Sequence, residues 1–383
     1  MTYRPFYFAS LAWNLGHGMS WMALPLYAAS QGLSNTQIGI LISVPVLAQA
    51  PLNLFGGAWN DRIGGRRILL ASICAMTLAA AWLIVAQGFW MLLVAQLGLV
   101  LSRAIFWPAV WAMASELPGE RGAHLGRLNA MTNFGQIAGN LLCGALLVAV
   151  GFRLTFLALA LSALFAFAAA FASRVGLPRQ GARHSPFKAY GALLRKPILL
   201  YSILCAYLSA VPFSLALSFY PLLLSHAGYP EDVSGVLLAL RSVGAIGAAL
   251  IASRFVRGGL GTPWPVWCGL LMVLATGLIP ATASHFAATG LWLFAAGIGS
   301  GAMTLYFQMT ISEASRPEER GSALALGGVG WNISLLTTPF AMGFFADRYG
   351  LANAFYVVTG ITLTVVALLA LVRASFVKRP ANV

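Results

Sequence analysis

Charged residues are scarce in this chain. They make up 8% of its 383 residues, whereas 60% are hydrophobic, and the mean hydropathy is +0.83. A soluble domain carries about 25% charged residues, because its surface faces water. The scarcity therefore argues against a water-soluble enzyme and for a protein whose outer surface contacts lipid.

Sequence patterns of common catalytic sites are also absent. The chain contains no His-Glu-x-x-His, no Gly-x-Ser-x-Gly and no Gly-x-x-x-x-Gly-Lys, the spacings of metalloprotease, hydrolase and phosphate-binding sites. Four isolated cysteines lack the spacing of a metal site or a disulfide: Cys74, Cys143, Cys205 and Cys268. The glycines at 297, 299 and 301 lie inside an apolar run, where small residues predict close helix packing. We expect no catalytic residue, no metal site and no cofactor.

Twelve apolar runs divide the chain. The length of each run is close to that of a helix that crosses a bilayer, about 20 residues. The runs cover 6–29, 37–59, 68–87, 91–114, 124–150, 154–173, 198–225, 233–256, 263–284, 288–311, 322–346 and 351–373. They predict an all-α membrane protein with twelve transmembrane helices.

Basic residues fall mainly in the loops on one side of these runs. The net charge of +14 comes from short clusters and not from one basic face, so nucleic acid is not an expected partner. Cytoplasmic loops are enriched in Lys and Arg, and we therefore expect both termini to be cytoplasmic. The expected location is the cell membrane, as a multi-pass protein of a bacterial inner membrane. Only Arg153 and Arg348 fall on the opposite side.

The two halves of the chain resemble each other. Glu120-Arg121-Gly122 recurs as Glu319-Arg320-Gly321, 199 residues later (319 − 120). The same offset relates Gly144, Gly151 and Phe156 to Gly343, Gly350 and Phe355. The repeat predicts two pseudo-symmetric six-helix halves, 1–173 and 198–383, joined by a cytoplasmic linker at 174–197.

A polar hinge separates the second and third runs. Its Gly-rich turn flanked by Arg suits a membrane surface and contains Gly57, Asp61, Arg62, Gly64, Gly65, Arg66 and Arg67. The stretch resembles the signature loop of the major facilitator superfamily of secondary transporters, which runs Gly, three residues, Asp-Arg, one residue, Gly-Arg-Arg. The extra Gly65 displaces the last two arginines from that pattern.

This resemblance implies a central site that opens alternately to each side of the membrane. It also implies that Asp61 and Arg62 latch the cytoplasmic side. A further stretch is similar to the antiporter motif of the superfamily, Gly-x-x-x-Gly-Pro-x-x-Gly-Gly, and contains Gly135, Gly139, Asn140, Cys143 and Gly144. Asn140 replaces the Pro and Cys143 replaces the first of the paired glycines, so the match favours exchange or export only mildly.

Acidic residues are absent from the middle of the runs. All nine lie in loops or at run ends. Proton-coupled drug exporters of the superfamily commonly carry a carboxylate in mid-membrane, so this coupling mechanism is disfavoured.

Two arginines, Arg103 and Arg241, do lie within runs. An Arg at a helix centre costs about 2.5–3.5 kcal/mol on insertion scales and usually faces a cavity or a partner. The nearest acids in sequence, Glu116 and Asp232, are about 20 and 13 Å away at about 1.5 Å per residue. Two unpaired guanidinium groups facing one cavity suit a carboxylate or phosphate. Alternatively, each Arg donates to backbone carbonyls or extends to the membrane surface and fixes helix packing.

Aromatic residues accompany the first of these arginines. Arg103, Trp107 and Trp111 are spaced four apart and share a helical face, and so do Trp13, His17 and Trp21 in the first run. These faces predict either an aromatic-walled cavity for an organic anion or ordinary packing. Further candidates with either role are Tyr207, Tyr306, Gln308 and Asn332. His17 could carry a coupled proton or be structural.

Three hypotheses of function follow from these residues. The first is secondary transport of a small amphipathic organic anion, by export or exchange, with Arg103 and Arg241 as charge partners. The second is a drug or sugar efflux pump coupled to protons through His17 or through an acid at a run end, Glu116 or Glu313. The third is a transporter-like receptor or scaffold that no longer cycles. We expect a monomer whose partners are a small-molecule substrate and membrane lipid.

Overall fold

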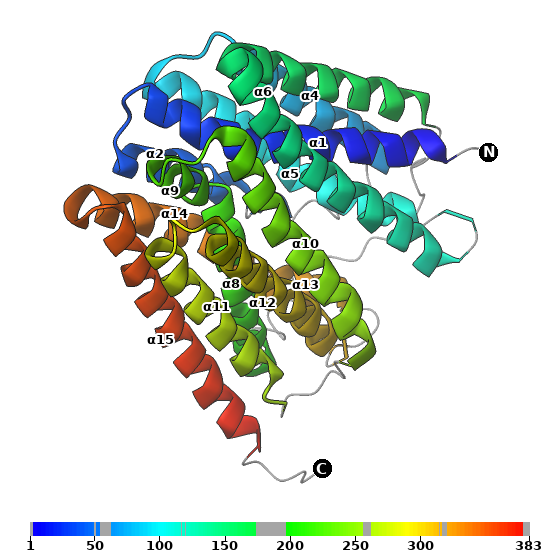
Figure 1. Cartoon of the computed structure of the whole chain (residues 1–383). Coiled ribbons are helices and arrows are strands. Elements are labelled where there is room, and N and C mark those ends of the chain that lie inside the picture. Colours follow the sequence, from blue (N-terminus) through cyan, green and yellow to red (C-terminus); the bar gives the residue numbers. More distant parts are fainter. Residues whose placement is uncertain are drawn as a thin grey trace. The chain divides into compact units, whose positions relative to one another are not determined.

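A computed structural model describes residues 3–49, 51–53, 63–115, 117–118, 120–173, 197–255, 262–313, 315 and 320–377. Regular structure over these residues is entirely helical (Figure 1). Eight of the described helices are long and apolar enough to cross a membrane. The prediction of an all-α membrane protein is therefore confirmed.

The helices follow the twelve predicted runs, and each run overlaps at least one of them. Their bounds are α1 (Arg4–Ser30), α2 (Asn35–Ser43), α4 (Gly65–Leu83), α5 (Gly88–Ser115), α6 (Arg121–Ala172), α8 (Pro197–Ala216), α9 (Tyr220–His226), α10 (Glu231–Phe255), α11 (Trp264–Ala281), α12 (Phe286–Glu313), α13 (Arg320–Gly327), α14 (Val329–Tyr349) and α15 (Leu351–Val377).

Three of the runs are interrupted, which the sequence patterns did not predict. In the run 37–59, α2 ends at Ser43, just before Pro45. In the run 198–225, α8 stops at Ala216 and α9 begins at Tyr220, next to Pro221. Proline lacks the N–H that would bond to the carbonyl four residues earlier. In the run 322–346, Gly328 separates α13 from α14.

Two glycines of the internal repeat interrupt the helical conformation in the same way. Gly151 interrupts α6 with φ 73° and ψ −177°, and Gly350 ends α14 with φ 84° and ψ 157°. Positive φ at these ψ values is open almost only to glycine. The offset of 199 residues (350 − 151) therefore relates two equivalent reversals between consecutive membrane helices.

The chain forms two compact units. The first contains Met1–Arg183 with Tyr229–Ala239, and the second contains His184–Gly228 with Leu240–Val383. Most of the predicted linker, 174–196, lies outside the described residues. The predicted halves, 1–173 and 198–383, stay a prediction.

In the first unit, α1 packs against α6, and α4 packs against α5 and α6. Glycines make the contact between α1 and α6 close. Gly135 abuts the backbone of Leu11, and Gly139 abuts the backbone of Leu15 and Gly18. Because small residues let membrane helices approach closely, these two glycines of the antiporter-like motif have a packing role within the unit.

In the second unit, α8 packs against α12 and α14, while α11 packs against α12 and α15. Its buried cluster includes Tyr201, Met272 and Tyr306. Gly297 and Gly301 of α12 abut the backbone carbonyls of Arg241 and Ala245 on α10. The prediction that the glycines at 297–301 serve helix packing is thereby confirmed.

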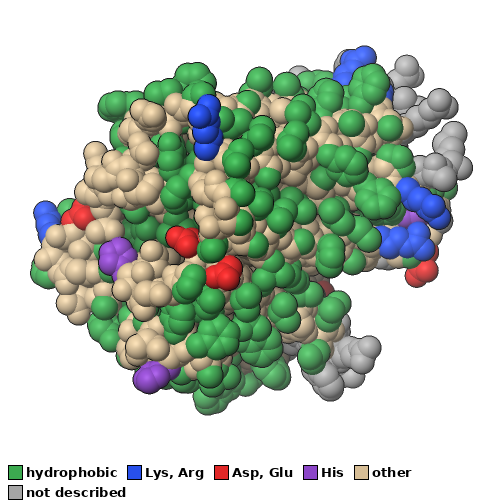
Figure 2. Space-filling model, turned by 45° about the horizontal axis from the view of Figure 1, so that its top comes forward, with side chains coloured by type: hydrophobic (Ala, Val, Ile, Leu, Met, Phe, Trp, Pro, Cys, Tyr) green, Lys and Arg blue, Asp and Glu red, His purple; other side chains and the backbone are tan. Residues whose placement is uncertain are grey.

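Large apolar side chains are exposed along many helices. Trp90 is 75% exposed, and Leu250 and Leu371 are each 68% exposed. Hydrophobic side chains spread over the face shown in Figure 2, where charged side chains are few. Such a surface is expected where helices face lipid hydrocarbon rather than water.

Candidate functional site

Arg103 is a buried cation in the first unit. It lies on α5 and is only 8% exposed. Within the described residues its guanidinium forms no hydrogen bond and no ion pair. These residues therefore do not support the alternative in which Arg103 donates to backbone carbonyls. Its charge is close enough to interact with His17 on α1. A buried cation without a counter-charge favours the binding of an anion.

His17 is fully buried on the adjacent helix α1. Neither of its ring nitrogens has a hydrogen-bond partner in the part of the chain that the structure describes. Its ring centroid lies 4.1 Å from that of Trp13 and 6.4 Å from that of Trp21. A buried polar group without a partner costs free energy, so His17 is a candidate for contact with a ligand.

Trp13 is a packing residue and not a cavity wall. Its side chain is 1% exposed and stacks on Phe106 with centroids 3.6 Å apart and ring planes 2° apart. Its indole Nε1–H donates to Ser102 Oγ at 3.0 Å. Of the alternatives for the trio on α1, packing therefore holds for Trp13.

Trp107 and Trp111 continue the aromatic row from Arg103. Trp107 meets Trp13 edge-on at 6.0 Å between centroids, and Trp107 and Trp111 are 5.4 Å apart. Trp107 is half-buried, whereas Trp111 is 48% exposed. The two share a helical face as predicted, and Trp107 is the one that reaches the buried rings.

The first unit also contains a polar network that sequence reasoning missed. Gln136 Nε2–H donates to Asn14 Oδ1 at 3.3 Å, and Asn14 Nδ2–H donates to the Ser10 carbonyl at 2.8 Å. Asn14 is fully buried on α1. A polar residue inside an apolar run was the available signal, and it applied to Asn14 as much as to His17.

Arg241 is the buried cation of the second unit, on α10 and 4% exposed. Its Nη2 donates to Ser242 Oγ at 3.2 Å, and its guanidinium carbon lies 5.7 Å from the centroid of the Phe213 ring. Its Nε has no partner among the described residues. Arg241 is therefore less isolated than the sequence suggested, since an aromatic face attracts a cation.

The other polar candidates of the second unit differ in their surroundings. Tyr306 is 2% exposed, and its hydroxyl lies 3.2 Å from that of Tyr201 and accepts from Thr262 Oγ1 at 3.3 Å. The Tyr207 hydroxyl accepts from Thr337 Oγ1 at 3.4 Å. Gln308 is exposed and Asn332 is half-buried. Tyr306 is thus held by hydrogen bonds inside the second unit. The substrate-binding roles of all four residues stay predictions.

Only part of the signature loop belongs to the described residues: Gly57, Asp61 and Arg62 lie outside them. Gly64, with φ 91°, precedes α4, and Arg66 lies in its first turn. Arg66 Nη2 donates to the Phe171 carbonyl in the last turn of α6 at 2.6 Å, whereas Arg67 is exposed. A cation at the end of a helix satisfies free carbonyls and the negative end of the dipole.

Asn140 and Gly144 complete the antiporter-like motif. Asn140 is buried, and its carbonyl faces Gly235 at the start of α10. Gly144 abuts the backbone of Glu231 and Asp232. These residues, like Gly135 and Gly139, bring two helices of the first unit into close contact.

Comparisons with known proteins agree with this architecture. The family model of the Major Facilitator Superfamily matches residues 6–285 and 214–382. A bacterial homologue of the human lysosomal transporter Spinster has the same fold, with a TM-score of 0.76, 16% identity and 100% of both chains covered. The nucleoside transporter NupG gives a TM-score of 0.77 at 12% identity over 96% of this chain and 99% of its own.

Curated relatives match over shorter stretches. The quinolone resistance protein NorA of Staphylococcus aureus is 24% identical over 127 residues, 33% of each chain. An uncharacterised MFS-type transporter of Mycobacterium tuberculosis is 31% identical over 149 residues, 38% of this chain and 35% of its own. The matched part thus spans about a third of the length of these relatives.

The resemblance inferred from the signature loop is therefore confirmed by the family match and by the fold. The family match and the structural neighbours also bear out the expectation of a transporter rather than an enzyme. The chain belongs to the Major Facilitator Superfamily and has the fold of a multi-pass membrane transporter.

Proposed function

We propose that this transporter moves a small amphipathic organic anion across the membrane, by export or exchange, with Arg103 and Arg241 as the charge partners of the substrate. The main support for the proposal is that the guanidinium of Arg103 is buried and has no hydrogen bond or ion pair among the described residues. Burying an unpaired charge is costly. Binding of an anionic substrate would compensate this charge.

The surroundings of both arginines favour an anion with an apolar part. Trp107 stands one turn from Arg103 on α5, and the ring of Phe213 lies beside Arg241. Guanidinium groups bind carboxylate or phosphate oxygens in pairs, and aromatic walls contact the apolar remainder of a ligand. Fully buried His17 offers a further polar contact near Arg103.

The distribution of acids supports export or exchange without a buried carboxylate. No Asp or Glu is buried among the residues that the structure describes. An inside-negative potential drives each negative charge outward by about 2.3 kcal/mol per 100 mV. Uniport of an anion outward, or electroneutral exchange of two anions, therefore needs no proton-carrying acid in mid-membrane.

The cellular arrangement and the gate belong to the same proposal. The cluster of basic loops supports cytoplasmic termini and a bacterial inner membrane, with the protein acting as a monomer in lipid. Asp61 and Arg62 act as the cytoplasmic latch, and the antiporter-like motif around Gly139 supports exchange.

A second candidate is proton-coupled efflux of a drug. It is supported by the partial similarity to the quinolone resistance protein NorA and by the two unpartnered ring nitrogens of His17. A histidine titrates in the physiological range and can carry a proton. In this mechanism His17 would exchange the proton, and Arg103 would hold the helices in place.

Ligand-induced thermal shifts and counterflow in proteoliposomes separate the two candidates. The ligands are aromatic carboxylates, neutral drugs and cationic drugs, and the variants are Arg103→Met, Arg241→Met and His17→Phe. Exposed Arg348→Met is the matched control, because it also removes one arginine. We expect stabilisation and counterflow with a carboxylate, lost in the first two variants and kept in the control.

The anion proposal fails if only cationic or neutral drugs stabilise the protein and the variants at Arg103 and Arg241 respond like the parent. Drug counterflow that needs a pH gradient and disappears in His17→Phe would instead support proton-coupled efflux.

A further inference from the structure

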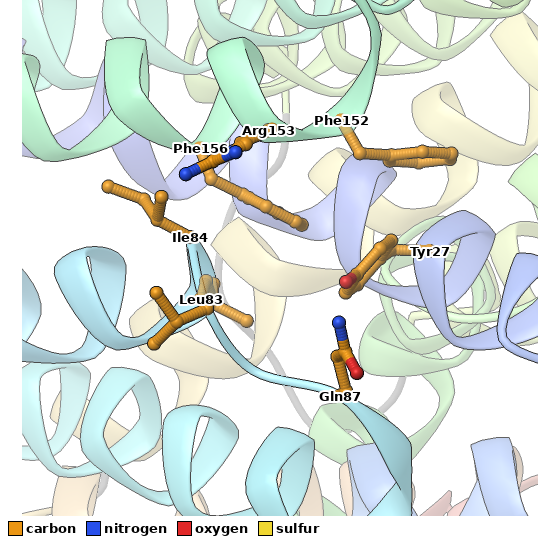
Figure 3. A pocket seen from close by; sticks show the side chains of 8 residues that line it. Tyr27, Leu83, Ile84, Gln87, Phe152, Arg153 and Phe156 are labelled. Atoms are coloured by element: carbon orange, nitrogen blue, oxygen red, sulfur yellow. The ribbon is translucent and has the colours of Figure 1, made fainter.

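The first unit contains a cavity of about 450 Å³ away from Arg103. Its lining comes from the end of α4 (Leu83), the following turn (Gln87), α1 (Tyr27) and the start of the second segment of α6 (Phe152, Arg153 and Phe156). Figure 3 shows these side chains around one space, with Arg153 and Gln87 entering from opposite walls.

The cavity lies at one membrane surface of the unit. Arg66, in the first turn of α4, bonds to Phe171 near the end of α6, whereas the cavity is lined by the other end of α4 and by residues just after Gly151. From 66 to 83 is 17 residues, or about 26 Å of helix at about 1.5 Å per residue, which is close to the thickness of the hydrocarbon core. The cavity is thus at the interface opposite to the Arg66 contact.

The walls combine one cation with aromatic rings. The Tyr27 ring centroid is 5.2 Å from that of Phe152 and 5.1 Å from that of Phe156. Arg153 is exposed, and the residues that line the cavity include no Asp or Glu. An arginine at an interface, next to apolar rings, suits a ligand with one anionic group on an apolar body.

The shape of the cavity is fixed by the fold before any ligand arrives. The Tyr27 hydroxyl donates to the Ala86 carbonyl at 2.9 Å, tying α1 to the turn after α4. Gly151 (φ 73°) reverses the chain immediately before Phe152, and Thr155 Oγ1 donates back to the Gly151 carbonyl at 2.8 Å. A preformed site loses little entropy on binding.

The internal repeat indicates that the chain reversal at this cavity does not require Arg153. At the offset of 199 residues, Gly350 and Phe355 repeat Gly151 and Phe156, but Ala352 stands where Arg153 would be (153 + 199). The reversal between helices forms in both places, so the arginine is not needed to make it. Arg153 is therefore free to serve a ligand, because its removal leaves the reversal intact.

We propose that this cavity is a second ligand site, for a carboxylate or phosphate attached to an apolar group. Arg153 binds the anion, Gln87 donates an amide N–H, and the rings of Tyr27, Phe152 and Phe156 contact the apolar part. The ligand is either a free organic anion or the headgroup of an anionic phospholipid, since both present this chemistry at a membrane surface.

Calorimetric titration of 2-naphthoate into protein in phosphatidylcholine nanodiscs tests the free-anion source. The variants are Arg153→Gln, Phe152→Leu and, as the matched control, Arg348→Gln, which removes the other arginine expected on this side of the membrane. We expect one binding event to weaken about 10- to 100-fold in Arg153→Gln, the range for losing a charge-assisted hydrogen-bond pair, with Arg348→Gln unchanged. Phe152→Leu should weaken naphthoate but not acetate.

Native mass spectrometry after reconstitution with phosphatidylglycerol tests the lipid source. Retention of this lipid by the parent and by Arg348→Gln, but not by Arg153→Gln, would assign the site to a phospholipid headgroup. The proposal is overturned if Arg153→Gln binds both naphthoate and phosphatidylglycerol like the parent. Arg103→Met distinguishes this site from the proposed transport site, because it should leave the Arg153-dependent event intact.

Discussion

The contact between α1 and α6 makes Gly139 the most informative position for substitution. A methyl group at Gly139 would collide with the Leu15 carbonyl and lie 3.0 Å from Gly18 Cα on α1. Both are backbone atoms, which cannot turn aside as a flexible side chain can. Gly139→Ala must therefore move α1 and α6 apart where they are in close contact.

The cost can be estimated from two opposing effects. Overpacking a close contact costs about 1–3 kcal/mol, and replacing Gly by Ala in a helix returns about 0.5–1 kcal/mol. Gly126 lies on the same helix with no atom within 4 Å of an added methyl, so Gly126→Ala keeps only the favourable effect. The free energy of unfolding should be lower in Gly139→Ala than in Gly126→Ala by about 1–3 kcal/mol.

Reversible unfolding in mixed detergent micelles, with a denaturing-detergent titration followed by circular dichroism, measures this difference. Equal midpoints for the two variants would refute the inference that the glycines of the antiporter-like motif serve close packing. We expect a lower midpoint for Gly139→Ala. Leu15→Gly should not restore this midpoint, because it leaves the backbone atoms of the clash in place.

Three further predictions follow from single contacts, each measured as the free energy of unfolding in the same titration. Arg66→Gln should lower it by about 0.5–1.5 kcal/mol, because it loses the hydrogen bond to the Phe171 carbonyl; exposed Arg67→Gln is the control, and an equal effect would contradict the capping role. Gly151→Ala should cost about 1–3 kcal/mol, because φ 73° with ψ −177° is a backbone conformation nearly exclusive to glycine, whereas Gly360→Ala in α15, with no atom within 4 Å of an added methyl, should not. Trp13→Phe should cost about 1 kcal/mol by removing the hydrogen bond to Ser102, and no loss would show that the ring stacking alone holds this side chain.

The sequence predicted the class and the helix pattern well. The length of an apolar run and the scarcity of charge are properties of the chain itself, and they decide whether a segment can cross a membrane. Gly151 and Gly350 could likewise be found from the repeat, because a positive φ depends on the residue type at that position. The signature loop and the count of apolar runs together identified the superfamily, although the first residues of the loop lie outside the described structure.

Side-chain neighbours from other helices could not be predicted in this way. Trp13 and Trp107 had the same spacing pattern in the sequence, yet only the structure shows Trp13 stacked on Phe106. Arg66 bonds to Phe171, 105 residues later, and the cavity joins Tyr27, Gln87 and Arg153 from three segments. Helical periodicity gives the face on which a residue lies, but the partner of that face depends on how helices pack. The sequence therefore determined the superfamily and the presence of two arginines within apolar runs, and the tertiary structure decided that both are buried and which residues surround each of them.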